Sequence, residues 1–505
     1  MKKIILLIAT ITLCINAYAK TIVVPTNIDF ANAEQKIIAN KDGKIYDANV
    51  IVDLSKIEGK LAEAKLIFVC DVLGEQAINP SLTFAIDGDE IGAVTLPLNS
   101  KQVGFDITRD IKKVLSDGKK STKIRVFSKG ANNKQRQVEI SKAILECSVE
   151  DEVYCQKQWN TPIFEGGTMY AESVFPLKNE GDKIAKINLY FKATKIIEAY
   201  TFLGGKKRIL KQGKDYILKD GCIAFPDTTS VKIFNNDDIY APATPEGIKK
   251  LGGSFFFPTI KKRALFREGT WFHKHMVYVS YKYSEKSDFV PEKFDGKKLP
   301  KTLAKLRSGK PLCVVLYGDS ISAGGNSSAR YNFPPYAKTW GEQFVENLRD
   351  TYKSKITYYN RALGGTRSHW GAMCINDLVL PDNPDLLIIA FGMNDRILAE
   401  KRKKYYQAMI SAVLKKNPNA EFILVCSIRG NTNWQKFDTH DSYEKSDKAM
   451  QCKNIAVADV RSAHTALLTK KRYIDMTGNH VNHPNDFLIR TYVQALSNIL
   501  IPQKK

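Results

Sequence analysis

The alternation of hydrophobic and polar residues changes character twice along the chain, and each part predicts a different architecture. Up to about residue 150, short alternating runs at 64–69, 81–86 and 122–127 are separated by polar turns, with one helical stretch near 108–115. Alternation with a period of two is typical of strands with one buried face. The pattern predicts a β-sandwich over residues 20–150.

The second part of the chain is again rich in strand-like runs and in aromatic residues. Residues 187–191 and 276–281 alternate in the manner of strands, which predicts a second β-rich domain over 151–297. Trp271, His273 and His275 gather near its end, and the spacing of the two histidines predicts one face of a strand and a structural role rather than a ligand site. The proline- and lysine-containing stretch 287–301 predicts a linker.

From residue 311 onward, apolar strand-like runs alternate with helical periodicity. Strands are expected at 312–317, 356–359, 386–391, 421–426 and 454–458, and helices near 338–352, 370–378, 401–414 and 486–499. This alternation predicts a parallel sheet covered by helices on both faces. In such a fold, functional residues gather at the carboxyl ends of the strands.

The N-terminus has the pattern of an export signal. Lys2 and Lys3 precede the apolar run 4–13, and Ala17-Tyr18-Ala19 fits the small-x-small cleavage rule. Cys14 raises the alternative of a lipoprotein, but Leu13 stands where a small residue would be expected. We therefore expect cleavage near Ala19 and export to the periplasm or the medium. No other apolar stretch approaches the roughly 18–20 residues that a membrane span needs.

Composition adds little beyond this outline. A length of 505 residues with 44% hydrophobic residues is typical of a globular protein of two to four domains. Loss of Lys2 and Lys3 with the signal lowers the formal net charge from +23 to +21. The positive charge is compatible with an anionic substrate. The lysines are scattered through every region, however, which is typical of ordinary solvated surfaces, and we expect no nucleic-acid partner. The spacing of the cysteines and histidines indicates no metal site.

Four short motifs follow predicted strands or precede the last helix. They are Gly318-Asp319-Ser320, Gly364-Gly365, Gly392-Met393-Asn394-Asp395 and Asn482-His483-Pro484. Serine and histidine are the nucleophile and base of acyl transfer, whereas a glycine N–H and an asparagine amide are donors that stabilise an oxyanion. The predicted topology brings all four motifs to one edge of the sheet.

These motifs, in this order, resemble those of the SGNH (GDSL-type) hydrolase superfamily over residues 311–500. The resemblance implies a three-layer, flavodoxin-like α/β catalytic domain, with boundaries 298–505, and extends to multi-domain carbohydrate acetyl esterases. It implies that Ser320 is the nucleophile and His483 the base. The oxyanion hole would consist of the N–H groups of Ser320 and Gly365 and the Asn394 side chain; Gly365 stands five residues after Asn360, as in the family. The stretch 103–108 and its neighbours are similar to jelly-roll modules of secreted polysaccharide-acting proteins.

One position departs from the family pattern. An aspartate is expected three residues before the histidine, but His480 stands there. Either Ser320 and His483 act as a dyad, which we favour, or another acid such as Asp475 reaches the imidazole. Asp319, Asn326, Arg367 and Trp370 are expected to line the substrate site, although Trp370 could equally belong to the core.

The sequence therefore predicts an exported serine ester hydrolase that deacetylates a polysaccharide through an acyl-enzyme on Ser320, without a metal or organic cofactor. Two alternatives remain open. A lipid esterase or lysophospholipase would use the same site, whereas a non-catalytic glycan-binding protein would have lost the activity of its hydrolase domain.

Overall fold

The computed structural model describes residues 19–24, 26–30, 37–41, 44–57, 61–73, 80–96, 102–128, 137–150, 161–434 and 438–503. The predicted export signal, apart from Ala19, lies outside the described residues. Among the described residues, no helix combines the length and the apolar character needed to cross a bilayer.

The N-terminal part of the chain forms antiparallel sheets, as predicted. Its strands are β1 (Ala19–Val24), β2 (Thr26–Phe30), β3 (Ile37–Lys41), β4 (Lys44–Tyr46), β5 (Ala48–Asp53), β6 (Leu61–Leu73), β7 (Ser81–Ile86), β8 (Asp89–Thr95), β9 (Gln102–Asp106), β10 (Ser121–Phe127) and β11 (Gln137–Glu150). One sheet has the order β4-β3-β11-β6-β9 with β1 paired to β11, and the other has the order β2-β5-β10-β7-β8. Buried side chains of both sheets and of helix α2 (Thr108–Ser116) form one apolar cluster.

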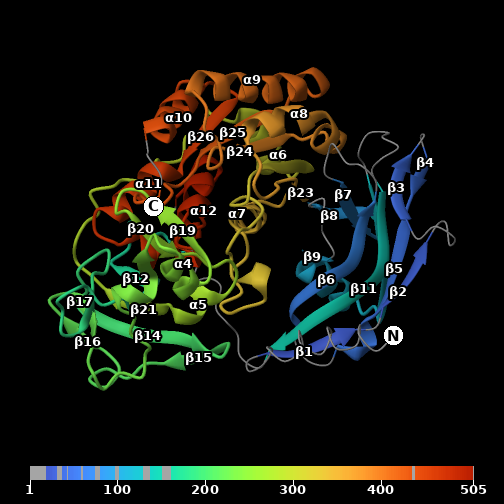
Figure 1. Cartoon of the computed structure of the whole chain (residues 1–505). Coiled ribbons are helices and arrows are strands. Elements are labelled where there is room, and N and C mark those ends of the chain that lie inside the picture. Colours follow the sequence, from blue (N-terminus) through green and yellow to red (C-terminus); the bar gives the residue numbers. More distant parts are fainter. Residues whose placement is uncertain are drawn as a thin grey trace.

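The middle part, residues 161–297, carries several small antiparallel sheets and short helices (Figure 1, green). Its strands are β12 (Thr168–Val174), β13 (Ala185–Ile187), β14 (Lys195–Leu203), β15 (Lys206–Ile209), β16 (Ile217–Lys219), β17 (Cys222–Phe225), β18 (Tyr240–Pro242), β19 (Ser254–Phe257), β20 (Lys262–Leu265) and β21 (Val277–Lys282). The helices are α3 (Asn236–Ile239), α4 (Pro245–Leu251) and α5 (Trp271–His275). The prediction that His273 and His275 share a strand face is wrong, because both lie on the short helix α5.

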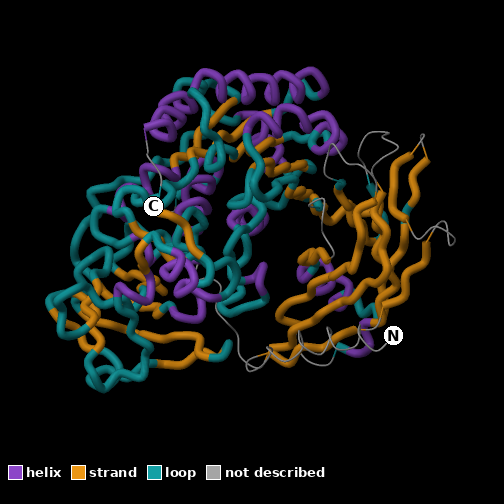
Figure 2. The backbone as a smooth tube through the Cα atoms, viewed as in Figure 1, coloured by secondary structure: helices purple, strands orange, loops and turns teal. Residues whose placement is uncertain are grey.

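The C-terminal part is a parallel sheet with helices on both faces, as predicted (Figure 2). The strands β22 (Leu312–Gly318), β23 (Ile356–Asn360), β24 (Leu386–Ala390), β25 (Glu421–Cys426) and β26 (Ile455–Asp459) have the order β23-β22-β24-β25-β26. The helices are α6 (Pro300–Ser308), α7 (Trp340–Thr351), α8 (Ser368–Leu378), α9 (Ala399–Lys416), α10 (Asp438–Lys448), α11 (Val460–Leu468) and α12 (Asp486–Leu500). The strand order reverses beside β22, which places the switch point of the sheet between β22 and β24.

Alternate residues of each central strand pack on opposite helical layers. Leu316 and Ile388 belong to the apolar cluster that includes α7 and α12, whereas Tyr317 and Ile389 belong to the cluster that includes α8 and α9. The strands are therefore buried on both faces, which explains their continuous apolar sequences.

The middle part and the parallel-sheet part share one core. Buried side chains from 163–283 and from 299–500 form a single apolar cluster. At the same boundary, Lys471 Nζ lies 2.6 Å from Glu172 Oε1, and both side chains are fully buried. The N-terminal sheets contact the parallel sheet at its other side, where β8 lies beside β23 and Lys355 Nζ is 2.5 Å from Asp89 Oδ1 (Figure 1).

We predict that the substitution Glu172→Gln destabilises the protein strongly. It would leave the ammonium of Lys471 buried without its carboxylate, and breaking a buried ion pair in this way costs about 3–5 kcal/mol. Urea unfolding measures the loss. The control Asp220→Asn removes the exposed pair of Lys186 and Asp220, and it should leave the unfolding midpoint unchanged. Equal small effects of both substitutions would contradict the prediction.

Candidate active site

Ser320 lies on a turn that directly follows β22, at the switch point of the sheet. The N–H of Gly325 donates to the Ser320 carbonyl at 2.7 Å, and the N–H of Ile321 donates to Asp319 Oδ1 at 3.1 Å, so a backbone bond and the Asp319 side chain together close the turn. The Ser320 side chain is half-buried, whereas Asp319 is 1% exposed. Burial raises the pKa of the Asp319 carboxyl to about 7.

His483 contacts Ser320 directly, although 163 residues separate them in the sequence. Its Nε2 lies 2.8 Å from Ser320 Oγ. The histidine stands on a tight loop, in which the N–H of Gly478 donates to the His483 carbonyl at 2.9 Å. The Asn479 side chain fills this loop, because its Oδ1 accepts from the backbone N–H groups of Val481, Asn482 and His483 at 2.9–3.0 Å.

The other ring nitrogen of His483 is held by Asn326. The distance from His483 Nδ1 to Asn326 Oδ1 is 2.7 Å. Asn326 Nδ2 donates to the carbonyls of Gly478 at 2.9 Å and Gly269 at 3.3 Å, which fixes the orientation of the amide. Since an amide oxygen only accepts hydrogen bonds, Nδ1 must carry the proton, and Nε2 is free to accept from the Ser320 hydroxyl.

The middle part of the chain supports Asn326 and also reaches the imidazole. His273 Nε2 donates to the Asn326 carbonyl at 2.9 Å. Glu268 Oε2 lies 3.3 Å from His483 Nδ1, and Glu268 Oε1 accepts from Asn479 Nδ2 at 3.0 Å. Burial opposes ionisation of Glu268, but the hydrogen bond and charge of His483 and the Asn479 amide outweigh it, so that its pKa is lowered.

Neither His480 nor Asp475 contacts the His483 ring. His480 is 1% exposed, and its Nδ1 donates to the Leu265 carbonyl at 3.1 Å. Asp475 Oδ1 accepts from the N–H of Phe175 and from Arg472 Nη2, both at 2.8 Å. His480 therefore fastens the histidine loop to the middle part of the chain, and Asp475 is engaged on the far side of that loop.

The two other motifs lie beside Ser320. Gly364 and Gly365 are exposed, and a Cβ at Gly364 would lie 3.7 Å from Ser320 Cβ. Gly365 has φ +78°, a conformation that glycine adopts without strain. Asn394 follows β24, and its Nδ2 donates to the Thr366 carbonyl at 3.0 Å, which leaves the amide a second N–H.

The residues expected to line the substrate site differ in position. Asp319 and Asn326 are buried behind Ser320 and His483, so the substrate-lining role predicted for them does not agree with the structure. Trp370 is half-buried and its ring lies 5.6 Å from that of Tyr317, on the core side of α8. Arg367 is exposed at the N-terminus of α8.

Sequence reasoning missed Glu268 and Asn479, and it gave His273 a structural role without linking it to the site. Glu268 belongs to another part of the chain, and no motif marks it. Asn479 lies four residues before His483, where a polar side chain in a short loop could have been read as a loop-closing residue.

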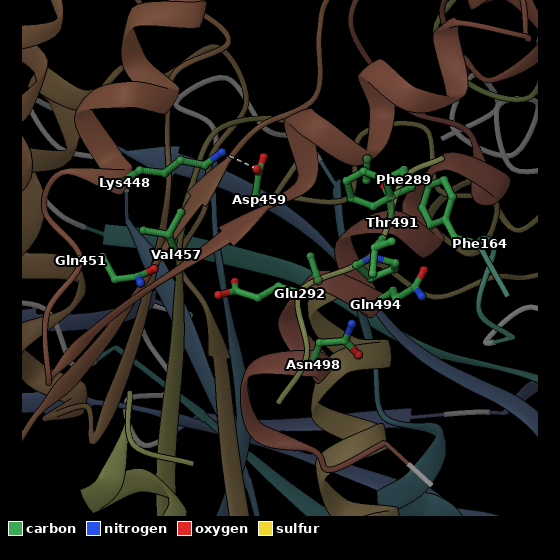
Figure 3. Close-up of a pocket in the computed structure, with 14 residues that line it drawn as sticks. Phe164, Phe289, Glu292, Lys448, Gln451, Val457, Asp459, Thr491, Gln494 and Asn498 are labelled. Carbon is green, nitrogen blue, oxygen red and sulfur yellow. Dashed lines mark ion pairs between the residues drawn. The ribbon is translucent and has the colours of Figure 1, made fainter. Parts of the chain in front are cut away.

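A separate groove of about 420 Å³ lies at the β26 edge of the sheet, between α12 and the segment that contains Phe289 and Glu292 (Figure 3). The ion pair of Lys448 and Asp459, 2.6 Å long, crosses one side of it. Ser320 and His483 are not among its lining residues. Among the described residues, no group of three or more His, Cys, Asp or Glu side chains is arranged to hold a metal ion.

Residues 316–487 match the family described as GDSL-like Lipase/Acylhydrolase. Among similar solved structures, a two-domain esterase active on acetylated mannans is 20% identical, with a TM-score of 0.34 over 41% of this chain and 53% of that chain. A mutant acetylxylan esterase from Geobacillus stearothermophilus is 17% identical, with a TM-score of 0.31 over 38% of this chain and 95% of that chain. The chain thus spans about half the length of the mannan esterase. Comparison with curated proteins finds no match.

We predict that His480 makes the folded protein less stable in acid. Burial lowers the pKa of His480 to about 4, whereas an exposed histidine titrates near 6.5. Below about pH 6.5 the unfolded chain therefore takes up a proton that the folded chain does not bind. The contribution of neutral His480 to the free energy of unfolding is fully present above this pH, and it falls by about 1.4 kcal/mol per pH unit towards pH 4.

Urea unfolding at pH 7 and pH 4.5 measures this contribution. The difference between the two unfolding free energies should be about 2–3 kcal/mol smaller in His480→Gln than in the wild type. Comparing two pH values within each protein removes the packing cost of the substitution. The variant His369→Gln, at an exposed position of α8, should leave the difference unchanged. An unchanged difference in His480→Gln would contradict the prediction.

Proposed function

We propose that this chain removes acetyl groups from a polysaccharide outside the cytoplasm. Its residues 316–487 form a domain of the GDSL-like Lipase/Acylhydrolase family, which makes it a carboxylic ester hydrolase. The observation that carries the proposal is the 2.8 Å contact between Ser320 Oγ and His483 Nε2, with the Nδ1 proton held on the opposite side of the ring. A serine in this arrangement is activated for attack on an ester carbonyl.

Ser320 and His483 would carry both half-reactions. His483 Nε2 takes the proton as Ser320 Oγ attacks the ester carbon, and it returns this proton to the oxygen of the leaving sugar hydroxyl. The acetyl group then remains on Ser320. Water then loses a proton to Nε2 as its oxygen attacks the acetyl carbon. The bond from this carbon to Ser320 Oγ breaks, Nε2 returns the proton to Oγ, and acetate leaves.

The negative oxygen of each tetrahedral intermediate would face three donors. These are the N–H groups of Ser320 and Gly365 and the second N–H of the Asn394 amide. The hydrogen bond from Asn394 Nδ2 to the Thr366 carbonyl fixes the amide in advance, so no reorganisation is required when the charge develops.

The surroundings of Ser320 favour a short acyl group. Gly364 and Gly365 offer little apolar surface beside the nucleophile, and the exposed side chains nearby include Arg330, Arg367 and Glu268. A lipid esterase would need an apolar cleft at this position to remove a long acyl chain from water. Glycines and charged side chains suit an acetyl group on a polar carrier better.

An aromatic surface next to the site supports a sugar substrate. We define it by Phe255, Phe266 and Trp434. Phe255 is 39% exposed, and its ring centroid lies 4.7 Å from that of Phe266 and 6.3 Å from that of Trp434. Phe266 precedes Glu268 by two residues. Trp434 follows Asn431, whose N–H donates to the Val481 carbonyl at 2.7 Å in the histidine loop. Aromatic rings with an exposed face stack on the C–H surfaces of sugar rings.

We predict that Ser320→Ala abolishes esterase activity. Loss of the nucleophile should lower kcat/KM on p-nitrophenyl acetate by about 10³-fold or more, and acetate release from acetylated glycans should cease. The wild type should hydrolyse p-nitrophenyl acetate faster than p-nitrophenyl octanoate. Equal activity of wild type and variant would support the non-catalytic alternative, and a preference for octanoate would support the lipid esterase.

We further predict that Phe255→Ala weakens action on polymers but not on small esters. Loss of one stacking ring should raise KM for an acetylated polysaccharide about 3- to 10-fold, which corresponds to about 0.5–1.5 kcal/mol. Activity on p-nitrophenyl acetate should stay constant. Phe256→Ala is the matched control, because Phe256 is 42% exposed on the same strand but its side chain alternates to the opposite side. An equal rise in KM for the polysaccharide in both variants would contradict a specific role of the aromatic surface.

A further inference from the structure

The position that the superfamily gives to the acid holds a histidine that cannot replace it. Burial lowers the pKa of His480 to about 4, so this side chain is neutral near pH 7, and its Nδ1 is bonded to the Leu265 carbonyl. In the proposed reaction, however, His483 becomes an imidazolium each time it takes the proton of Ser320. A nearby carboxylate would stabilise that charge.

Of the carboxylates that the structure describes, Glu268 is the one within 4.0 Å of a His483 ring nitrogen. We infer that Glu268, supplied by the middle part of the chain, is the acid of this active site: it positions His483 and stabilises its protonated form. The inference rests on the proposed function and deepens it, because it names a residue outside residues 316–487 on which the reaction depends.

Asn326 and Glu268 contact the same nitrogen but do different things. Asn326 Oδ1, at 2.7 Å, fixes which nitrogen carries the proton, yet a neutral amide cannot balance a positive charge. Glu268 Oε2, at 3.3 Å, brings the negative charge. Because the Glu268 side chain is 42% exposed, water screens this interaction, and its effect should be smaller than that of a fully buried acid.

Asn479 ties the two partners together. Its Nδ2 donates to Glu268 Oε1 at 3.0 Å, while its Oδ1 accepts from the backbone N–H of His483 at 3.0 Å. One buried side chain therefore sets the position of both the base and its acid. Such shared support is characteristic of a preorganised site rather than a surface ion pair.

His480, which stands where an aspartate is expected, helps to position Glu268. The bond from His480 to the Leu265 carbonyl holds the end of β20, three residues before Glu268. Just after Glu268, the Gly269 carbonyl accepts from Asn326 Nδ2. Residues 265–269 are thus bonded, on both sides of Glu268, to the loops that carry His483 and Asn326.

Steady-state kinetics of the full-length chain test this role with Glu268→Gln and Glu268→Asp. On p-nitrophenyl acetate, Glu268→Gln should lower kcat about 10- to 100-fold with little change in KM, since the Asn326 contact remains. The acid limb of the pH profile should move to lower pH, because the carboxylate that favours the imidazolium is gone. Arg330 and Asp319 also act on this pair and are unchanged in both proteins. Glu268→Asp should recover part of the rate.

Two controls separate the outcomes. Glu292→Gln, at an exposed glutamate beside the distant groove, should leave the kinetics unchanged (Figure 3). Ser320→Ala tests the proposed function itself: if it retains full activity, that function fails, whereas an inactive Ser320→Ala with a fully active Glu268→Gln overturns only the role of Glu268. A loss in Glu268→Gln that follows a lower melting temperature and leaves the acid limb in place would also overturn it.

Discussion

The hydrogen bond between His483 Nδ1 and Asn326 Oδ1 is the constraint around which the site is built. It requires a proton on Nδ1, and this in turn leaves Nε2 as an acceptor 2.8 Å from Ser320 Oγ. The bond also brings together three segments that are far apart in sequence: the turn after β22, the loop before α12 and the segment around Gly269. Each segment is fixed by backbone groups of another, so the catalytic geometry does not depend on any one loop alone.

Close packing of the loops makes this convergence possible. A Cβ at Gly325 would lie 2.9 Å from His483 Cε1 and 2.8 Å from the Ser320 carbonyl, and a Cβ at Gly478 would lie 2.3 Å from Asn326 Cβ. Both positions therefore require glycine for steric reasons. The absence of two side chains allows the imidazole and the amide to occupy the space between the turn and the loop, which keeps Asn326 out of water.

The parallel sheet and the placement of the four motifs at one of its edges could be predicted from the sequence, because continuous apolar strands and the residues that follow them are local features of the chain. The sequence could not predict Glu268, whose contact with His483 joins residues 215 apart with no periodic signal between them. The same limit explains the wrong prediction that His273 and His275 share a strand face. A short run of residues does not distinguish strand alternation from one turn of helix, and tertiary packing determines that these residues form α5. Asn326 was expected to line the substrate site, whereas its side chain is buried against His483, because burial of a loop amide depends on tertiary contacts.

The proposed active site is assembled across two parts of the chain. It requires that these parts do not move relative to each other, because a shift of about 1 Å would break contacts of this length. The buried interface meets that demand with directional interactions. Lys471 binds Glu172 in the shared core, and Arg490 Nη1 and Nη2 on α12 donate to the carbonyls of Tyr170 and Thr161 at 2.6 Å. Apolar contacts alone would permit sliding, whereas buried charges bonded to particular partners fix the register of the two parts. In the proposed mechanism the middle part therefore contributes to catalysis through Glu268, and these buried polar contacts hold it in place against the parallel-sheet part.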